Sequence, residues 1–285
     1  MIHELPLERR TLHGHFSRDL PPVLSVEPGD SVRISTPDSG WTLEDGTEFE
    51  PRSSPEDDGH ALAGPIEVRG ARAGQALAVH LDEVVPGPHG VTFSRWPHKI
   101  DWRLEGTTGR ASTGHVVRLR PFLGVLGMPP AEHGVHATIP PRPHGGNIDC
   151  KELVAGTTLF LPIPVDGALF SAGDGHAAQG DGEVSGTAIE CPSSAQLTLD
   201  IHDGLDLEWP CARIDGAWLT FGFHEHLGRA AKIAVDGMIA LMGRTHGLAA
   251  DDALALASVV VDLRVTQVVN EVLGVHALLR DDAWQ

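Results

Sequence analysis

A glycine turn that leads into alternating apolar and polar residues occurs three times in the sequence, and it restricts the fold more than any other feature. The three segments are residues 24–36 (LSVEPGDSVRIST), 66–82 (IEVRGARAGQALAVHLD) and 152–163 (ELVAGTTLFLPI). Successive side chains of a β-strand point to opposite faces, so each pattern predicts a strand with one apolar face. Residues 195–202 (AQLTLDIH) alternate in the same way. These segments predict sheets that bury one face.

Turn residues recur throughout the first two-thirds of the chain. They are spaced about eight to twelve residues apart, which is typical of sandwich and barrel proteins. The 285 residues include 33 Gly and 21 Pro, an excess that disfavours a mostly helical protein. We therefore predict a mainly β fold, a sandwich-like or barrel-like body.

The pattern changes after about residue 218. Residues 225–244 place apolar side chains at helical spacing, and Gly247 follows as a stop signal. A second helix is expected from Asp251 or Asp252 to about Ser258, and the β-branched residues of 259–268 predict a strand. We predict a β-rich body over residues 1–218 that carries the functional site, with an α/β portion over 219–285 packed on it.

The charge balance excludes some classes of partner. There are 39 acidic against 21 basic residues, a formal net charge of −18, which disfavours nucleic acid and anionic membrane surfaces. The sequence has no apolar run of the roughly 18 residues that a spanning helix needs. Three cysteines without a C-x-x-C pair, and residues 1–10 without a signal-peptide pattern, indicate a cytoplasmic protein.

One polar segment allows two interpretations. Residues 38–59 (DSGWTLEDGTEFEPRSSPEDDG) can form a solvated surface loop. They can also form a lid over a site, because long loops are often functional.

The chemistry is concentrated in residues 173–190 (GDGHAAQGDGEVSGTAIE). This window holds the polar residues Asp174, His176, Gln179, Asp181, Glu183 and Glu190 between five glycines. Asp, Glu and His are ligands for zinc and other divalent ions, and acids gathered this closely need a cation or hydrogen bonds to offset their repulsion. On an extended strand Asp174 and His176 face the same side, as do Asp181 and Glu183. The alternative is a solvated glycine-rich turn; the spacing of a calcium EF-hand is missing.

The same window resembles the signature of the acetamidase/formamidase family of metal-dependent amidohydrolases. Three further segments are similar to that family: residues 13–30 (HGHFSRDLPPVLSVEPGD), 59–74 (GHALAGPIEVRGARAG) and 144–163 (HGGNIDCKELVAGTTLFLPI). The C-terminal helices and VTQVVN (265–270) resemble it too, so the likeness covers nearly the whole chain. It implies a β-rich hydrolase of the C–N bonds of linear amides that releases ammonia and holds a divalent metal.

The clustering suggests a set of metal ligands. Asp174 and His176 are the first choices, and the partners expected from distant parts of the chain are Asp149, in GGNID, and His60, in GHALAGP. Zinc is the metal expected, with calcium as the alternative.

The remaining roles are assigned by chemistry. Glu183 is expected to act as general base and acid, with Asp181 as its alternate, because the departing nitrogen must be protonated. Asn147 and Gln179 are expected to hold the amide by hydrogen bonds.

The sequence thus predicts hydrolysis of a small amide of the formamide or acetamide type to carboxylate and ammonia through a metal-activated water. One alternative is that the same site hydrolyses another C–N bond, in a larger amide or a carbamate. The other is a metal-binding or ligand-binding β protein without turnover. The resemblance also implies a homo-oligomer, expected to be a dimer.

Overall fold

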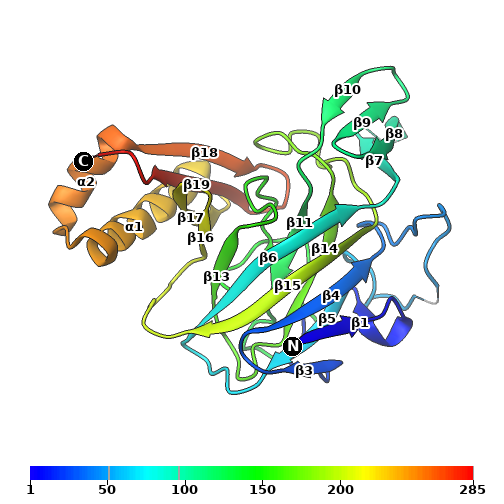
Figure 1. Ribbon diagram of the computed structural model, residues 1–285, viewed down its shortest axis with the longest axis horizontal. Helices are drawn as coiled ribbons and strands as arrows, with labels where there is room; N and C mark the ends of the chain where they lie inside the picture. Colours follow the sequence, from blue (N-terminus) through cyan, green and yellow to red (C-terminus); the bar gives the residue numbers. More distant parts are fainter. Residues whose placement is uncertain (51, 96, 285) are drawn as a thin grey trace.

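The computed structural model describes residues 1–50, 52–95 and 97–284. It is mainly β, as the sequence predicts (Figure 1). The strands are β1 (Ile2–Leu5), β2 (Leu12–His13), β3 (Leu24–Val26), β4 (Asp30–Thr36), β5 (Leu62–Val68), β6 (Ala76–Pro86), β7 (His89–Phe93), β8 (Lys99–Glu105), β9 (Thr108–Ala111), β10 (Val116–Arg118), β11 (Phe122–Gly127), β12 (Gly145–Asn147), β13 (Thr158–Pro162), β14 (Phe170–His176), β15 (Ser193–His202), β16 (Cys211–Ile214), β17 (Ala217–His224), β18 (Val261–Gln267) and β19 (Leu273–Arg280). The helices are a 3-10 turn η1 (Arg9–Thr11), α1 (Leu227–His246) and α2 (Ala250–Val260).

Two sheets form the body of the protein. A nine-stranded sheet runs in the order β1-β4-β15-β6-β13-β16-β17-β19-β18. A six-stranded sheet runs β12-β11-β14-β5-β2, with β3 paired to β5. In Figure 1 the strands β4, β15 and β6 lie in front of β5, β14 and β11. One apolar cluster contains buried residues from both sheets, among them Leu81 and Leu197 from the first and Ile66 and Leu126 from the second. The body is therefore a sandwich with a shared core.

The predicted glycine turns are present in the structure. Gly29, Gly74 and Gly156 have φ values of 85°, 90° and 89°, a left-handed backbone that glycine adopts without steric cost. Each lies just before a strand (β4, β6 or β13) whose alternate residues are buried. The local pattern of turn and alternation was thus a correct guide to these elements.

A smaller sheet projects from the body beside the acidic, glycine-rich segment of residues 173–190. It has four strands in the order β10-β9-β8-β7 and stands apart from the two main sheets in Figure 1. An isolated bridge joins Val91 of β7 to Glu190. This bridge connects the projecting sheet to the acidic, glycine-rich segment.

The C-terminal part has the predicted order of helix, helix and strand. α1 packs on β17 and β19, and its buried side chains include Ala230, Ala234 and Met238. A Cβ at Gly222 would lie 2.1 Å from the carbonyl oxygen of Ala230, so the glycine allows the helix to approach the sheet. Gly247 ends α1 in a left-handed conformation, as predicted.

The nine-stranded sheet is continuous across residue 218, which lies within β17, and the division into two portions there stays a prediction. Among the helices that the structure describes, we find none with the length and apolar character to cross a membrane.

Candidate active site

The glycines on either side of Asp174 explain the unusual composition of β14. A Cβ at Gly173 would lie 2.2 Å from the carbonyl oxygen of Ala61, and one at Gly175 would lie 2.3 Å from Oγ of Ser193. One face of the strand therefore packs directly against neighbouring chain. Asp174 and His176 alternate with these glycines and lie on the other face, where both are buried.

His176 lies among three carboxylates. Its Nε2 atom is 3.4 Å from Oδ2 of Asp174 and 3.3 Å from Oε2 of Glu190, and its Nδ1 atom is 3.9 Å from Oδ1 of Asp149. These separations exceed the roughly 2.7–2.9 Å of a charge-assisted hydrogen bond. Asp149 follows β12, and Glu190 reaches the cluster through an antiparallel bridge to His176. Glu183 completes a second group with Asp149 and His176, in which the ligand atoms lie within 4.8 Å of one another.

The cluster contains buried oxygens that no donor in the described structure satisfies. They are Oδ1 of Asp149, Oδ1 of Asp174 and Oε2 of Glu190. Buried polar atoms are almost always paired, and unpaired carboxylate oxygens are the most costly to leave so. Two possible ligand groups meet at His176, one with Asp174 and Glu190 and one with Asp149 and Glu183, and a divalent cation held there would offset the charge of these carboxylates.

The backbone of β11 leaves space at the same point. A Cβ on Gly124 would lie 2.4 Å from Oδ2 of Asp174, 2.5 Å from Oδ1 of Asp149 and 3.0 Å from Cε1 of His176. Two carboxylates and the imidazole from separate segments thus converge on the one residue of this strand where a side chain would fill their meeting point. Oxygen and imidazole donors in this arrangement fit a divalent metal ion such as zinc.

Hydrogen bonds determine which nitrogen of His176 is free to bind a metal. Nε2 of Gln179 donates to the backbone oxygen of Asp149 at 2.7 Å, which directs Oε1 of the same amide to Nδ1 of His176 at 2.9 Å. An amide oxygen only accepts, so Nδ1 carries a proton and Nε2 is the nitrogen available to a metal. Asn270 donates from Nδ2 to Oδ2 of Asp149 and orients that carboxylate.

Three acids of the cluster adopt a left-handed backbone. The φ values are 51° at Asp149, 64° at Asp174 and 45° at Glu183. Non-glycine residues rarely adopt this conformation, which costs of order 1–3 kcal/mol and is concentrated at functional sites. The fold therefore tolerates strain in order to direct these carboxylates inward.

The charges alter one another's pKa values. The pKa of Glu183 is raised to about 7, mainly by burial; the positive charge of His176 opposes this rise, and the negative charge of Glu190 adds to it. Burial also raises the pKa of Asp149, with Glu183 adding to the effect. Burial alone would lower the pKa of His176, but Glu190 and Asp174 raise it well above its usual range. The cluster favours a positive charge at its centre, from an imidazolium proton or a metal ion.

Pockets reach the cluster from two sides. One of about 400 Å³ is lined by Gln179, Asp181 and Glu183 together with Trp102 and Val117 of the projecting sheet. Another of about 670 Å³ is lined by Glu190 and by residues between 38 and 48. The first part of the 38–59 loop therefore forms a wall of a pocket that contains Glu190.

The structure brings together four of the residues that the sequence singled out, namely Asp149, Asp174, His176 and Glu183. Gln179 joins them through its hydrogen bonds to His176 and to the backbone oxygen of Asp149. The other three lie as follows. The Nδ1 atom of His60 is hydrogen-bonded to Oγ1 of Thr138 at 2.7 Å, and His60 is in none of the described ligand groups.

Asp181 is exposed and pairs with Lys151 at 3.0 Å, so it does not share a face with Glu183 as expected on a strand. Gly182 bridges to Gln267 and the chain turns at Glu183, which separates the two acids. Asn147 is buried, and its Oδ1 has no hydrogen-bond partner in the described structure.

Three further residues of the site received no role from the sequence: Glu190, Asn270 and Gly124. Glu190 lies inside the acidic window, so its ligand chemistry was visible. Asn270 is 121 residues from Asp149, and no local pattern connects them. The run FLGVLG around Gly124 shows only a glycine in an apolar strand, which can signal a close approach.

Fold and site together define a mainly β protein with a buried carboxylate–histidine cluster suited to a divalent cation. The chain belongs to the acetamidase/formamidase family, whose model matches residues 3–133 and 128–214. This confirms the resemblance carried by the sequence motifs.

Individual relatives agree with this assignment. A crystal structure of acetamidase from Bacillus halodurans is 28% identical with a TM-score of 0.86, covering 98% of this chain and 97% of that one. An acetamidase structure from Yersinia enterocolitica is 26% identical with a TM-score of 0.88, covering 100% and 94%. The acetamidase of Mycolicibacterium smegmatis is 24% identical, and the match covers 67% of this chain and 66% of that protein. The chain spans between 60% and 66% of the length of the curated relatives that it matches.

Proposed function

We propose that this protein hydrolyses the C–N bond of a small linear amide, of the formamide or acetamide type, to a carboxylate and ammonia. The observation that carries the proposal is the set of unpaired buried oxygens on Asp149, Asp174 and Glu190 around His176. Membership of the acetamidase/formamidase family supports the reaction class, and the names of its relatives support the substrate class.

The metal would be held by Asp174, His176, Glu190 and Asp149. A divalent ion there, zinc being the one proposed, would supply Lewis-acid chemistry, which polarises a carbonyl and lowers the pKa of water to about 7. Gln179 and Asn270 keep the imidazole and the Asp149 carboxylate in orientation for this role.

Glu183 is the residue proposed to transfer protons. Its carboxylate is buried, lies in a group with Asp149 and His176, and lines the 400 Å³ pocket. From this position it would accept a proton from the attacking water and donate it to the departing nitrogen. Asp181 lines the same pocket but is paired with Lys151, which makes it the weaker candidate.

Amide recognition is proposed for Asn147, whose buried Oδ1 is an acceptor without a partner in the described structure and would suit a substrate N–H. Gln179 already bonds His176 and Asp149 through both ends of its amide, so a contact to substrate would use its second N–H or the second lone pair of Oε1.

Two alternatives use the same cluster. A larger amide or a carbamate would be hydrolysed by the same groups, and the 670 Å³ pocket beside Glu190 has volume for more than acetamide. A metal-binding protein without turnover would need the ligands but not Glu183.

Ammonia release separates these functions. The protein, stripped of metal and reloaded with zinc, is supplied with formamide, acetamide, longer aliphatic amides and carbamates. We expect release from the short amides, loss with a chelator and recovery with zinc, and no release from Glu183→Gln although that variant still binds metal. Release confined to larger amides or carbamates favours the first alternative. No release from any compound by zinc-loaded protein refutes the enzyme proposal.

We further propose a cytoplasmic homodimer. The compartment is supported by three cysteines that are all buried and free. The dimer is implied by the family resemblance. Gel filtration with light scattering measures the molar mass in solution, and a monomeric mass would contradict the dimer.

A further inference from the structure

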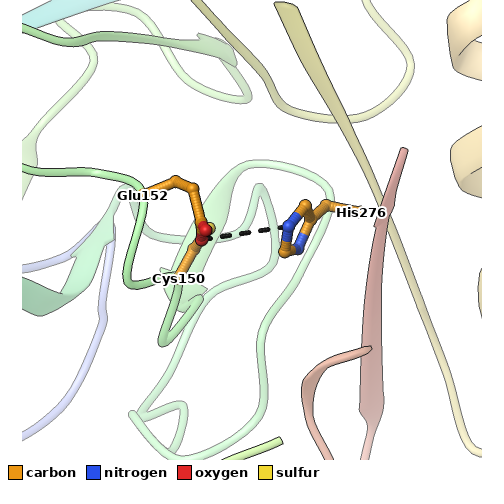
Figure 2. A group of neighbouring side chains, drawn as sticks. All are labelled: Cys150, Glu152 and His276. Atoms are coloured by element: carbon orange, nitrogen blue, oxygen red, sulfur yellow. Dashed lines mark hydrogen bonds and ion pairs between the residues drawn. The ribbon is translucent and has the colours of Figure 1, made fainter. Parts of the chain in front are cut away.

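A second cluster of metal-ligand side chains lies outside the candidate active site. Cys150 and Glu152 come from the turn that follows β12, and His276 comes from β19 (Figure 2). All three side chains are buried, with exposed fractions of 1%, 5% and 0%. Residues more than 120 positions apart thus direct a thiol, a carboxylate and an imidazole toward one point.

The spacing of the donor atoms suits a single ion. Sγ of Cys150 is 3.6 Å from Oε2 of Glu152, which is 3.9 Å from Nε2 of His276. The three ligand atoms all lie within 4.8 Å of one another. Tetrahedral zinc, with bonds of about 2.3 Å to sulfur and about 2.0 Å to nitrogen or oxygen, separates its ligands by about 3.3–3.5 Å. Small inward rotations of the side chains would reach that geometry.

The surroundings orient the imidazole and the carboxylate. Nδ1 of His276 is hydrogen-bonded to Oγ1 of Thr266 at 2.9 Å, and Oε1 of Glu152 accepts from Arg264 at 2.9 Å. Ligating histidines and carboxylates are typically held in this way through their second atom. In each residue the other atom, Nε2 or Oε2, faces the cluster.

A purely hydrogen-bonded cluster does not account for His276. Its Nε2 atom is buried and has no hydrogen-bond partner in the described structure. A buried donor or acceptor left unpaired costs about 1–3 kcal/mol. The thiol of Cys150 donates to Glu152, at 3.6 Å, so it leaves this nitrogen unsatisfied. A ligand that accepts electrons from Nε2 resolves the deficit.

We propose that Cys150, Glu152 and His276 form a second metal site for a divalent cation of the zinc class. Sulfur and imidazole donors select zinc or cobalt over calcium and magnesium, which prefer oxygen ligands alone. On binding, the S–H bond breaks, a sulfur–metal bond forms, and the proton passes to solvent. The ion would fasten the turn that carries Asp149 to the strand pair β18–β19, behind the candidate active site.

Cobalt(II) loading of the full-length protein tests the proposal, because a cobalt–thiolate bond gives a near-ultraviolet charge-transfer band. None of the proposed active-site ligands is a cysteine, so the band reports on the second site alone. In wild-type protein we expect two bound cobalt ions per chain. The ion at the Cys150 site gives the band, and the ion at the candidate active site gives none. Asp174→Asn should lose the second ion and keep the band.

The variants identify the thiol. Cys150→Ser should abolish the band and reduce bound metal by one ion per chain, and His276→Gln should weaken it. Cys211→Ser is the matched control, since Cys211 is equally buried but lies in none of the described ligand groups. Absence of the band in wild-type protein at saturating cobalt overturns the proposal, whether or not Cys150→Ser folds. A band retained by Cys150→Ser also overturns it. If only one cobalt binds per chain and the band is present, the result supports this second site and argues against the metal proposed for the active site.

Discussion

Asp174 and His176 lie two residues apart on β14, and Oδ2 of the first is 3.4 Å from Nε2 of the second. The strand brings them to one face, and the left-handed backbone at Asp174, with φ of 64°, turns its carboxylate toward the imidazole. The pair forms the fixed centre to which Asp149 and Glu190 are added from elsewhere in the chain.

Filling the space opposite this pair should remove metal binding while leaving the fold intact. In Gly124→Ala the new methyl group would lie 2.4 Å from Asp174 and 2.5 Å from Asp149, where the cation is expected. Gly124 lacks a positive φ, so the backbone accepts alanine. We expect metal analysis to show the loss of one ion per chain, with an unchanged circular dichroism spectrum. Gly228→Ala, where a Cβ meets no atom within 4 Å, is the control. Full metal content in Gly124→Ala would falsify the location of the site.

Glu183 should oppose stability while serving activity. It combines a φ of 45° with a buried carboxylate near other acids. Glu183→Gly relieves backbone strain of about 1–3 kcal/mol. Glycine loses more conformational entropy on folding, which offsets roughly 0.5–1 kcal/mol of this gain. In the presence of a chelator, we expect its free energy of unfolding to rise by about 1 kcal/mol, while ammonia release is lost.

Denaturant titration measures this change in unfolding free energy. Val184→Gly is the neighbouring control, because Val184 is 83% exposed and has no positive φ. It should be neutral or destabilising by up to about 1 kcal/mol. A Glu183→Gly variant less stable than Val184→Gly would show that the acid is held without strain.

Asn270 should act on the metal through Asp149. Its amide donates to Oδ2 of Asp149, so Asn270→Ala leaves that carboxylate free to rotate. Losing such a supporting contact typically weakens metal affinity by about 10–100-fold. Competition with a chromogenic chelator measures the affinity. Asn270→Asp should bind metal more weakly than Asn270→Ala, because it places a negative charge against Asp149. Equal metal affinities for the two variants would show that the contact is only structural.

Much of the fold could be predicted because its elements carry local signals. The turn at Gly74 and the alternation of Leu77, Val79 and Leu81 determine β6 without reference to any other strand. Strand order has no such signal. β15 lies between β4 and β6, which precede it by more than 100 residues, and only the packed structure shows this.

The site divides in the same way. Asp174 and His176 could be paired from strand periodicity, because both lie within β14, but nothing in the sequence indicated the left-handed backbone at Asp174. The same rule was wrong for Asp181 and Glu183, because Gly182 and Glu183 have φ values of 92° and 45° and the chain is not a regular strand there. Asn270 could not be found, because its contact with Asp149 depends on how β18 and β19 pack against the body.

Acid should destabilise the protein through a histidine that is not part of the metal cluster. His13 is buried, with hydrogen bonds to Ser171 and to the backbone of His15. The pKa of His13 is lowered to about 4, mainly by burial; the hydrogen bond to the backbone of His15 and the charge of Asp57 oppose the change, and the charge of His15 adds to it. Between pH 6.5 and 4 the unfolded chain therefore binds a proton that the folded chain does not, so the free energy of unfolding falls as pH falls.

The shift from 6.5 to about 4 corresponds to about 3 kcal/mol lost between pH 7 and pH 4 from this residue. Denaturant titrations with a chelator, at pH values from 7.5 to about 4, measure the slope. His13→Gln should reduce that slope by about one proton, although it destabilises the protein at neutral pH. His115→Gln is the control, because His115 is exposed and should leave the slope unchanged. Equal slopes for wild-type protein and His13→Gln would mean that His13 gains its proton without unfolding.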